Sequence, residues 1–364
     1  MLGAASSLGD PTRDVKRVVI VDDSQAMRGW LRLVMEQDPR LTVVGEAASA
    51  YEARHVIKQV SPDVLTLDIE MPGMNGLDFL ERLMRLRPMP VVMITGATRN
   101  HSTATIQALS LGAIDYILKP TAANDQAAQL LMSRRVYSAA CSTVQPREMA
   151  QRQAALTVPV ARTDVMPLIM IGASTGGVAA LETVLSGLDP SGPPVVIVQH
   201  MPGPFLVSFA KQLNRQLDQN VGLVREREVL QPGQIRLAPA DGAHTEVLRK
   251  GTAWTCRFVP EGQNTLHCPS VDVLFHSATR HASDVIAVML TGLGHDGAEG
   301  MVALRANGAS TLGQDEATSV VYGMPRVAYE RGGVQKQLPL GRLGNAINGA
   351  VAAWYANAEK GRPS

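Results

Sequence analysis

Aromatic residues are scarce in this chain, at 4% of its 364 residues, and cysteine occurs only three times. Cys141, Cys256 and Cys268 lack the spacing of a metal site, and an odd number of cysteines does not suit a disulfide framework. Unpaired thiols are typical of a reducing compartment. We therefore expect a cytoplasmic protein whose cysteines are structural.

A charge excess of either sign and a long apolar run are also missing. The chain has 34 Lys and Arg residues against 33 Asp and Glu residues, a net charge of +1, and these residues are scattered along it. Because no basic stripe is present, we expect no nucleic acid as partner. No apolar run approaches the about 20 residues of a membrane-spanning helix, and residues 1–17 lack the apolar core of a signal peptide. We expect no insertion into a membrane.

What the chain does have is apolar residues, at 45%, arranged in two successive α/β patterns. The runs "RVVIVDD", "LTVVGEA", "VLTLD", "VVMIT" and "AIDYIL" alternate with helical stripes such as Met27, Leu31, Val34 and Met35. Continuous apolar strands between amphipathic helices predict a parallel sheet covered on both faces. The alternation resumes after a polar, proline-containing stretch, in which "REMAQRQAAL" has room for a turn or two of helix.

The second pattern contains the buried strands "LIMIG", "PVVIVQ" and "DVIAVMLT". We interpret "GQIRLAP" and "TEVLRKGTAWTCRFV" as antiparallel strands with a Lys-Gly turn. The prediction is two doubly wound parallel-sheet α/β domains: a flavodoxin-like (βα)5 domain and a Rossmann-like domain with a small antiparallel addition. The predicted limits are a flexible N-terminus over residues 1–15, the first domain over 16–140, a linker over 141–166 and the second domain over 167–358.

Acidic residues of the first domain gather where its strands end. Asp22 and Asp23 follow the first strand and Asp68 ends the third, at the carboxyl edge where open parallel sheets bind ligands. Converging carboxylates repel one another and need a cation, for which Mg²⁺ is the best match. One of them can then attack a phosphoryl group, with Thr95 and Lys119, at the ends of the fourth and fifth strands, as donors to its oxygens.

The first domain resembles a response-regulator receiver domain, because "VDDS", "LDIEMPGMNG", "MITG" and "DYILKP" stand where that family has them. The resemblance implies that Asp68 takes a phosphoryl group from a histidine kinase while Asp22 and Asp23 hold Mg²⁺. It also implies that Thr95 and Tyr116 form a switch pair that reports phosphorylation to the domain surface.

The second domain opens with "LIMIGASTGGVAAL", in which a buried strand turns sharply into a helix around Ser174. Gly172 to Gly176 match G-x-S-x-G, the turn that exposes a nucleophilic serine above a parallel sheet. A phosphate-binding use of this turn lacks both the Lys-Ser/Thr pair of a P-loop and the spacing G-x-G-x-x-G. As an alternative, the turn could serve as an anion nest in a non-hydrolytic output domain that binds a nucleotide or a partner.

A serine nucleophile needs a general base and an acid that orients the base. His200 follows "PVVIVQ" and Asp296 follows "DVIAVMLT", so both belong to the edge where Ser174 emerges. His295 is the competing base, but its adjacency to Asp296 directs the two side chains differently. His244 could line the pocket. No role is assigned to His55, His101, His276 or His281.

The second domain is similar to the methylesterase domain of the chemotaxis receptor-modifying enzymes, a family to which "IGASTGG", "QHMP", "PSVDVLFHS", "LTGLGHDGAEGM" and "YGMPR" correspond. The resemblance implies hydrolysis of γ-glutamyl methyl esters on the cytoplasmic domains of chemoreceptors, with methanol as product, and often deamidation of receptor glutamines. It also implies a chemotaxis histidine kinase as phosphodonor. Leu293 replaces a common methionine, and Cys268 stands where a basic residue is frequent.

The expected mechanism uses Ser174 as nucleophile, His200 as general base and Asp296 as its orienting acid, and it needs no cofactor. The backbone N–H groups expected to bind the oxyanion belong to Thr175, Gly176, Leu293 and Gly294. The unphosphorylated receiver is expected to block the esterase site, and phosphorylation of Asp68 to relieve the block. We expect a monomer. A DNA-binding output is disfavoured, because no basic helix-turn-helix pattern follows the linker.

Overall fold

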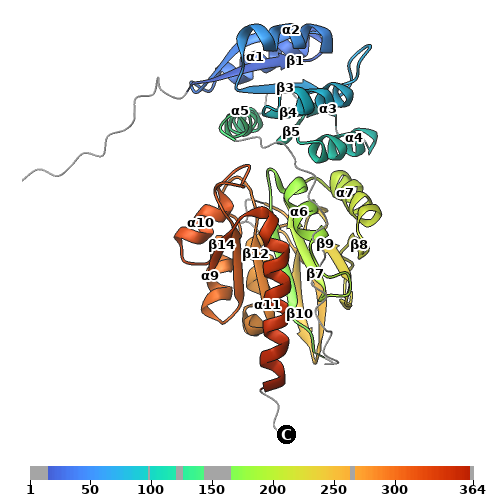
Figure 1. The fold of residues 1–364 in the computed structure, drawn as a ribbon, viewed down its shortest axis with the longest axis vertical. Helices are drawn as coiled ribbons and strands as arrows, with labels where there is room; N and C mark the ends of the chain where they lie inside the picture. The colour runs from blue at the N-terminus through green and yellow to red at the C-terminus, as the bar shows by residue number, and fades with distance from the viewer. Residues whose placement is uncertain (1–14, 97–98, 120–125, 143–164, 263–266, 361–364) are drawn as a thin grey trace, which may run out of the picture. The chain divides into compact units, whose positions relative to one another are not determined.

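The computed structural model divides into two compact units, one built around an N-terminal sheet and one around a C-terminal sheet (Figure 1). The predicted flexible N-terminus and most of the predicted linker, including its possible helix, lie outside the described part of the chain. The residues that the structure describes are 15–96, 99–119, 126–142, 165–262 and 267–360.

The first sheet has five parallel strands in the order β2-β1-β3-β4-β5, which is the flavodoxin-like order predicted from the sequence. Its strands are β1 (Lys16–Val21), β2 (Leu41–Ala47), β3 (Val64–Asp68), β4 (Val91–Thr95) and β5 (Asp115–Leu118). The helices that alternate with them along the chain are α1 (Gln25–Glu36), α2 (Ala50–Val60), α3 (Gly76–Leu86), α4 (Arg99–Ser110) and α5 (Gln126–Ala140).

The sequence of the first unit explains these elements locally. Residues 18–21 of β1 are fully buried, as expected for a strand with helices on both faces of its sheet. Ser24 ends the turn after β1, and its Oγ accepts the Met27 N–H at 3.3 Å as the N-cap of α1. The Ser24 N–H donates to Asp22 Oδ1 at 2.9 Å, so the helix start also fixes an acidic side chain at the strand end.

The second sheet has seven strands, all parallel, in the order β14-β13-β12-β6-β7-β9-β8. Its strands are β6 (Leu168–Ala173), β7 (Val195–Gln199), β8 (Asn220–Leu223), β9 (Gln234–Leu237), β12 (Val285–Met289), β13 (Ser310–Gln314) and β14 (Lys336–Leu338). The helices of this part of the chain are α6 (Gly177–Ser186), α7 (Gly203–Gln216), α8 (Val271–Ser277), the 3₁₀ helix η1 (Thr279–Asp284), α9 (Ala298–Ala306), α10 (Met324–Glu330) and α11 (Leu340–Lys360).

The antiparallel addition is a single hairpin of β10 (Ala243–Lys250) and β11 (Ala253–Pro260). The predicted Lys-Gly turn joins these strands, and Gly251 has the positive φ of +60° that such a turn favours. The prediction that "GQIRLAP" is antiparallel was wrong, because β9 pairs in parallel with β7 on one side and with β8 on the other. Arg236 in this strand is buried and ion-paired with Glu228 at 2.7 Å, which satisfies a polar residue within the sheet.

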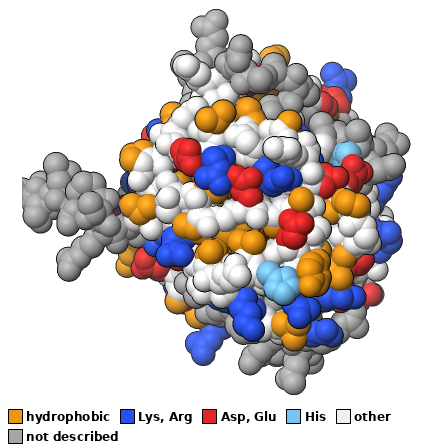
Figure 2. Space-filling view, turned by 90° about the horizontal axis from the view of Figure 1, so that it is seen from above, with side chains coloured by type: hydrophobic (Ala, Val, Ile, Leu, Met, Phe, Trp, Pro, Cys, Tyr) orange, Lys and Arg blue, Asp and Glu red, His pale blue; other side chains and the backbone are white. Residues whose placement is uncertain are grey.

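The core of the second unit joins the sheet, the hairpin and α8. Trp254 of β11 and Phe275 of α8 are fully buried in the same cluster, and the Trp254 Nε1–H donates to Met166 O at 3.1 Å. Within the described residues, no helix has the length and hydropathy needed to cross a membrane. Figure 2 shows one face of the molecule, on which Lys and Arg side chains lie among Asp and Glu side chains.

Candidate active site and phosphoacceptor site

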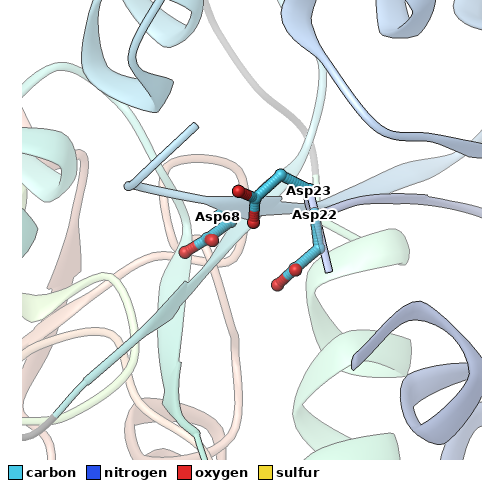
Figure 3. Close-up of side chains that lie close together, drawn as sticks. All are labelled: Asp22, Asp23 and Asp68. Carbon is cyan, nitrogen blue, oxygen red and sulfur yellow. The ribbon is translucent and has the colours of Figure 1, made fainter. Parts of the chain in front are cut away.

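The predicted acidic cluster forms at the carboxyl edge of the first sheet. Asp22 and Asp23 directly follow β1, Asp68 is the last residue of β3, and one carboxylate oxygen from each lies within 4.8 Å of the others (Figure 3). Asp22 and Asp68 are buried, whereas Asp23 is exposed. The cluster therefore has two fixed carboxylates and one that faces solvent.

Lys119 connects the cluster to the end of β5. Its Nζ lies 2.8 Å from Asp68 Oδ2 and 3.2 Å from Asp22 Oδ2, and its backbone N–H donates to Thr95 O at 2.7 Å. Burial and the neighbouring charge of Asp22 raise the pKa of Asp68, although the ammonium group of Lys119 opposes this shift. Burial lowers the pKa of Lys119, but the hydrogen bond and charge of Asp68 outweigh it and raise that pKa overall.

The acidic cluster fits a hard divalent cation. Its three carboxylates carry more negative charge than the one ammonium group of Lys119 neutralises, and the buried Asp22 Oδ2 has the ion pair with Lys119 but no well-aligned hydrogen bond among the described residues. Oxygen ligands from a few carboxylates are the usual protein contribution to a Mg²⁺ site, which keeps several waters and phosphate oxygens. The donor set predicted from the sequence is thus brought together by the fold.

The two predicted switch residues are buried in adjacent strands. Thr95 ends β4, and its Oγ1 donates to Gly96 O at 3.4 Å. Tyr116 of β5 lies under the guanidinium of Arg135, whose Cζ is 5.3 Å from the ring centroid. Burial raises the pKa of the Tyr116 hydroxyl far above its ordinary value, so this group is neutral at any physiological pH.

Ser174 occupies a tight strand-to-helix turn in the second unit. It follows the last residue of β6, its N–H donates to Thr291 O at 3.0 Å, and its own carbonyl accepts the Gly177 N–H at 2.8 Å. Gly176 in this turn has a φ of +77°, and a Cβ there would lie 2.6 Å from Val320. The turn requires glycine for both reasons, as the G-x-S-x-G pattern indicates.

His200 leaves the neighbouring strand at the same edge. Ala173 of β6 pairs with Gln199 of β7, so Ser174 and His200 are the next residues of two adjacent parallel strands. The His200 N–H donates to Ala173 O at 3.1 Å, and Gln199 Nε2 donates to Ser174 O at 2.9 Å. Two predicted triad members therefore lie side by side through backbone register alone.

His200 and Asp296 form a direct hydrogen bond. His200 Nε2 lies 2.8 Å from Asp296 Oδ2, and the two side chains are 9% and 12% exposed. His200 Nδ1 is buried and has no hydrogen-bond partner. Among the described residues, Ser174 Oγ makes no hydrogen bond, so the third link of the predicted triad is not formed in this state. With Nε2–H donated to Asp296, the free lone pair of the base is on Nδ1.

Asp296 is held by the start of α8. Its carboxylate accepts hydrogen bonds from Ser270 Oγ at 2.8 Å, the Val271 N–H at 2.7 Å and the Asp272 N–H at 3.1 Å. Burial favours a higher pKa for Asp296, but His200 and these two amides outweigh it and hold the pKa well below its ordinary value. Asp296 is therefore a carboxylate at any physiological pH and can stabilise an imidazolium.

The predicted oxyanion donors differ in their availability. The Ser174 N–H already donates to Thr291 O and the Gly177 N–H to Ser174 O, so neither is available to an oxyanion. In the described part of the chain, no acceptor pairs with the N–H groups of Gly176, Leu293 or Gly294. The Thr175 carbonyl accepts the Thr291 Oγ1–H at 3.0 Å, which connects the Ser174 turn to the loop after β12.

One site residue was missed by sequence reasoning. The His267 ring stacks on His200 with centroids 4.1 Å apart and an interplanar angle of 21°. Its position in "LHCPSVD", three residues before the cap of α8, is the only sequence signal that could have drawn attention to it. His295, the competing base, is exposed, and His244 is buried with its Nδ1 accepting the Ser270 N–H at 3.1 Å.

Comparisons with known proteins cover both units. The chain matches a family profile described as CheB methylesterase over residues 169–347 and one described as response regulator receiver domain over residues 18–130. It is 45% identical over 336 residues to the protein-glutamate methylesterase/protein-glutamine glutaminase 1 of Caulobacter vibrioides, covering 91% of this chain and 96% of that protein. It is 46% identical over 341 residues to the corresponding protein of Rhizobium etli, covering 93% and 97%. The crystal structure of the Thermotoga maritima CheB methylesterase catalytic domain is 29% identical, covers 51% of this chain and 99% of that chain, and gives a TM-score of 0.49.

Proposed function

The chain belongs to the family of protein-glutamate methylesterases/protein-glutamine glutaminases that carry a receiver domain, and from this premise we propose a specific reaction and its control. The enzyme hydrolyses γ-glutamyl methyl esters on chemoreceptor cytoplasmic domains and deamidates receptor glutamines. Phosphorylation of Asp68 by a chemotaxis histidine kinase activates it. The observation that carries the proposal is the hydrogen-bonded His200–Asp296 pair on the sheet edge where Ser174 emerges.

In the acylation step, the Ser174 hydroxyl attacks the ester carbonyl carbon while its proton passes to His200 Nδ1. Asp296 accepts the Nε2–H of the same ring throughout and stabilises the imidazolium, while remaining a carboxylate itself. A small rotation of the Ser174 side chain is needed, because catalytic hydrogen bonds often form only in the substrate complex.

The tetrahedral intermediate then collapses, and the C–O bond to the methoxy group breaks. His200 returns its proton to the leaving group, so methanol departs from an ester and ammonia departs from a glutamine amide. Water attacks the resulting acyl-enzyme with His200 again as base, which releases glutamate and restores Ser174. Water is the only co-substrate that acylation and deacylation together consume.

The negative oxygen of the intermediate needs donors on the side opposite His200. The proposed source is the N–H groups of Gly176, Leu293 and Gly294, for which no acceptor occurs among the described residues, together with the Thr175 N–H expected from the sequence. Loss of one such donor typically costs about 3 kcal/mol of transition-state stabilisation. Leu293 acts through its backbone, so replacement of the methionine common at this position is compatible with activity.

In the first unit, Asp68 is proposed as the nucleophile toward the phosphodonor. Asp22, Asp23 and Asp68 would hold Mg²⁺, which supplies charge neutralisation of the phosphoryl oxygens when bound. Lys119 already contacts Asp68 and can donate to a phosphoryl oxygen, and Thr95 and Tyr116 respond to the new charge as the switch pair. This local change of charge biases the esterase toward its active state.

The test is methanol release from methylated receptor membranes. Ser174→Ala removes the attacking oxygen, so methanol release should fall at least 10³-fold while the fold is retained. Ser186→Ala is the matched control, because this serine at the end of α6 is exposed and its hydroxyl donates to the Thr183 carbonyl, its one side-chain hydrogen bond among the described residues. Full activity of the Ser174 variant would contradict a serine-esterase mechanism and favour a non-hydrolytic output domain.

A further inference from the structure

His267 covers the general base on one side. The two imidazole rings are nearly parallel and stacked, with 4.1 Å between centroids; the His200 side chain is 9% exposed, whereas His267 is exposed. A stacked ring of this kind restricts rotation of the ring beneath it and keeps water from one of its faces. His267 thus contacts a group that must transfer a proton, without a hydrogen bond to it.

The same short segment also holds the orienting acid. Three residues after His267, Ser270 donates its Oγ–H to Asp296, and the next two N–H groups donate to the same carboxylate. The segment is anchored to the hairpin, since the Ser270 N–H donates to Nδ1 of the buried His244 in β10. Residues 267–272 therefore contact both His200 and Asp296 and set their relative positions.

On the basis of the proposed function, we propose that His267 is a positioning residue for the general base. Its ring stacks on His200, whose Nδ1 is buried without a hydrogen-bond partner, and by restricting rotation of the His200 ring it would keep that atom available to the Ser174 hydroxyl. The contribution is one of orientation, which raises the rate of acylation without binding the receptor.

The electrostatics of the stack agree with a neutral ring. Although His267 is exposed as a residue, desolvation of its ring where it lies against its neighbours, together with the adjacent His200 and His295, lowers its pKa below the ordinary value, and Asp296 opposes this shift. The His267 ring is therefore neutral near pH 7. A permanent cation at the same place would repel the imidazolium that forms at His200 during acylation.

The experiment measures acylation of Ser174 by a small sulfonyl fluoride as a function of pH, because this probe needs no receptor docking. His267→Phe keeps a flat ring and should react within about threefold of wild type. His267→Ala should slow the reaction about tenfold, with a lower kcat and an unchanged KM for methanol release. His267→Lys should move the acid limb of the pH profile down by about one pH unit, since a like charge disfavours protonation of His200.

Two controls make the outcomes decisive. His276→Ala, on the exposed face of α8, should match wild type. Equal rates for wild type, His267→Ala and His267→Lys would overturn the proposal, and so would a His267→Phe variant as slow as His267→Ala, because the ring nitrogens would then be required. If Ser174→Ala still releases methanol, the proposed function fails instead, so the two failures are distinguishable.

Discussion

Asp296 accepts four hydrogen bonds, from His200, Ser270 and two consecutive amides at the start of α8, which fills the acceptor capacity of its carboxylate. All of these donors favour its charged form, which explains why its pKa lies below the ordinary range despite burial. The carboxylate is thus fixed in place before substrate arrives. Such preorganisation lets it stabilise the imidazolium without reorganisation during the reaction.

Asp296→Asn should lower kcat by roughly 10³–10⁴ and leave KM nearly unchanged, because a neutral amide cannot stabilise the charged base.

The same substitution should also change how the stability of the native state depends on pH. A carboxylate with a depressed pKa stabilises the native state above about pH 4, and this contribution is lost as the pH falls further. Thermal unfolding at several pH values should therefore show the largest Tm difference between wild type and variant near neutrality. A difference that grows on acidification would contradict this account.

The three residues of the proposed triad could be predicted from the sequence because each follows a strongly apolar strand, directly or after a short loop. The strand ends determine which side chains share an edge, and Ser174 and His200 meet through that rule alone. His267 could not be found in this way. It lies outside the strand ends, and its contact with His200 depends on the course of the segment after the hairpin.

The loop of residues 291–294 shows how neighbouring elements build the site without supplying side-chain chemistry. A Cβ on Gly292 would lie 2.3 Å from Met324 Sδ and 2.8 Å from Ser174 Cβ, so only glycine fits between the nucleophile turn and α10. Gly292 also donates to Val321 O and accepts from the Met324 N–H. The segment "YGMPR" therefore supports the loop whose amides are the proposed oxyanion donors.

Gly323→Ala should displace that loop, because the new Cβ would lie 2.6 Å from Gly292 O and 3.2 Å from Gly294 N. The φ of Gly323 is −104°, which alanine adopts freely, so the effect is steric and local. Methanol release should fall about 10²-fold, as for a lost oxyanion donor. Gly349→Ala in α11, where no atom lies near the new methyl group, should leave the rate unchanged. Equal rates for both variants would exclude this role for the loop.

Elements with continuous apolar runs were predicted correctly, whereas short and polar strands were not. β13 contains serine, threonine, glycine and glutamine, and β14 has three residues, so neither shows an apolar run. Their strand conformation depends on pairing, because β13 pairs with β12 and β14 pairs with β13. β9 was predicted as a strand but with the wrong direction, because direction depends on the strands beside it and not on its own side chains.

The chain has two candidate sites, each at the carboxyl edge of its own parallel sheet. One edge gathers carboxylates around Asp68, and the other gathers Ser174, His200 and Asp296. Both sites follow from the rule that ligands of open α/β sheets bind where the strands end. The individual sheets do not determine how the charge state of Asp68 changes the rate at Ser174, and we propose that phosphorylation couples the two sites.

The measurement that tests it most directly is methanol release from methylated receptor membranes with and without a small phosphodonor in the presence of Mg²⁺. We expect the phosphodonor to increase the rate for wild type, and the increase to disappear in Asp68→Asn and on chelation of Mg²⁺, while Ser174-dependent basal release persists. An Asp68→Asn enzyme that is stimulated as fully as wild type would contradict the account.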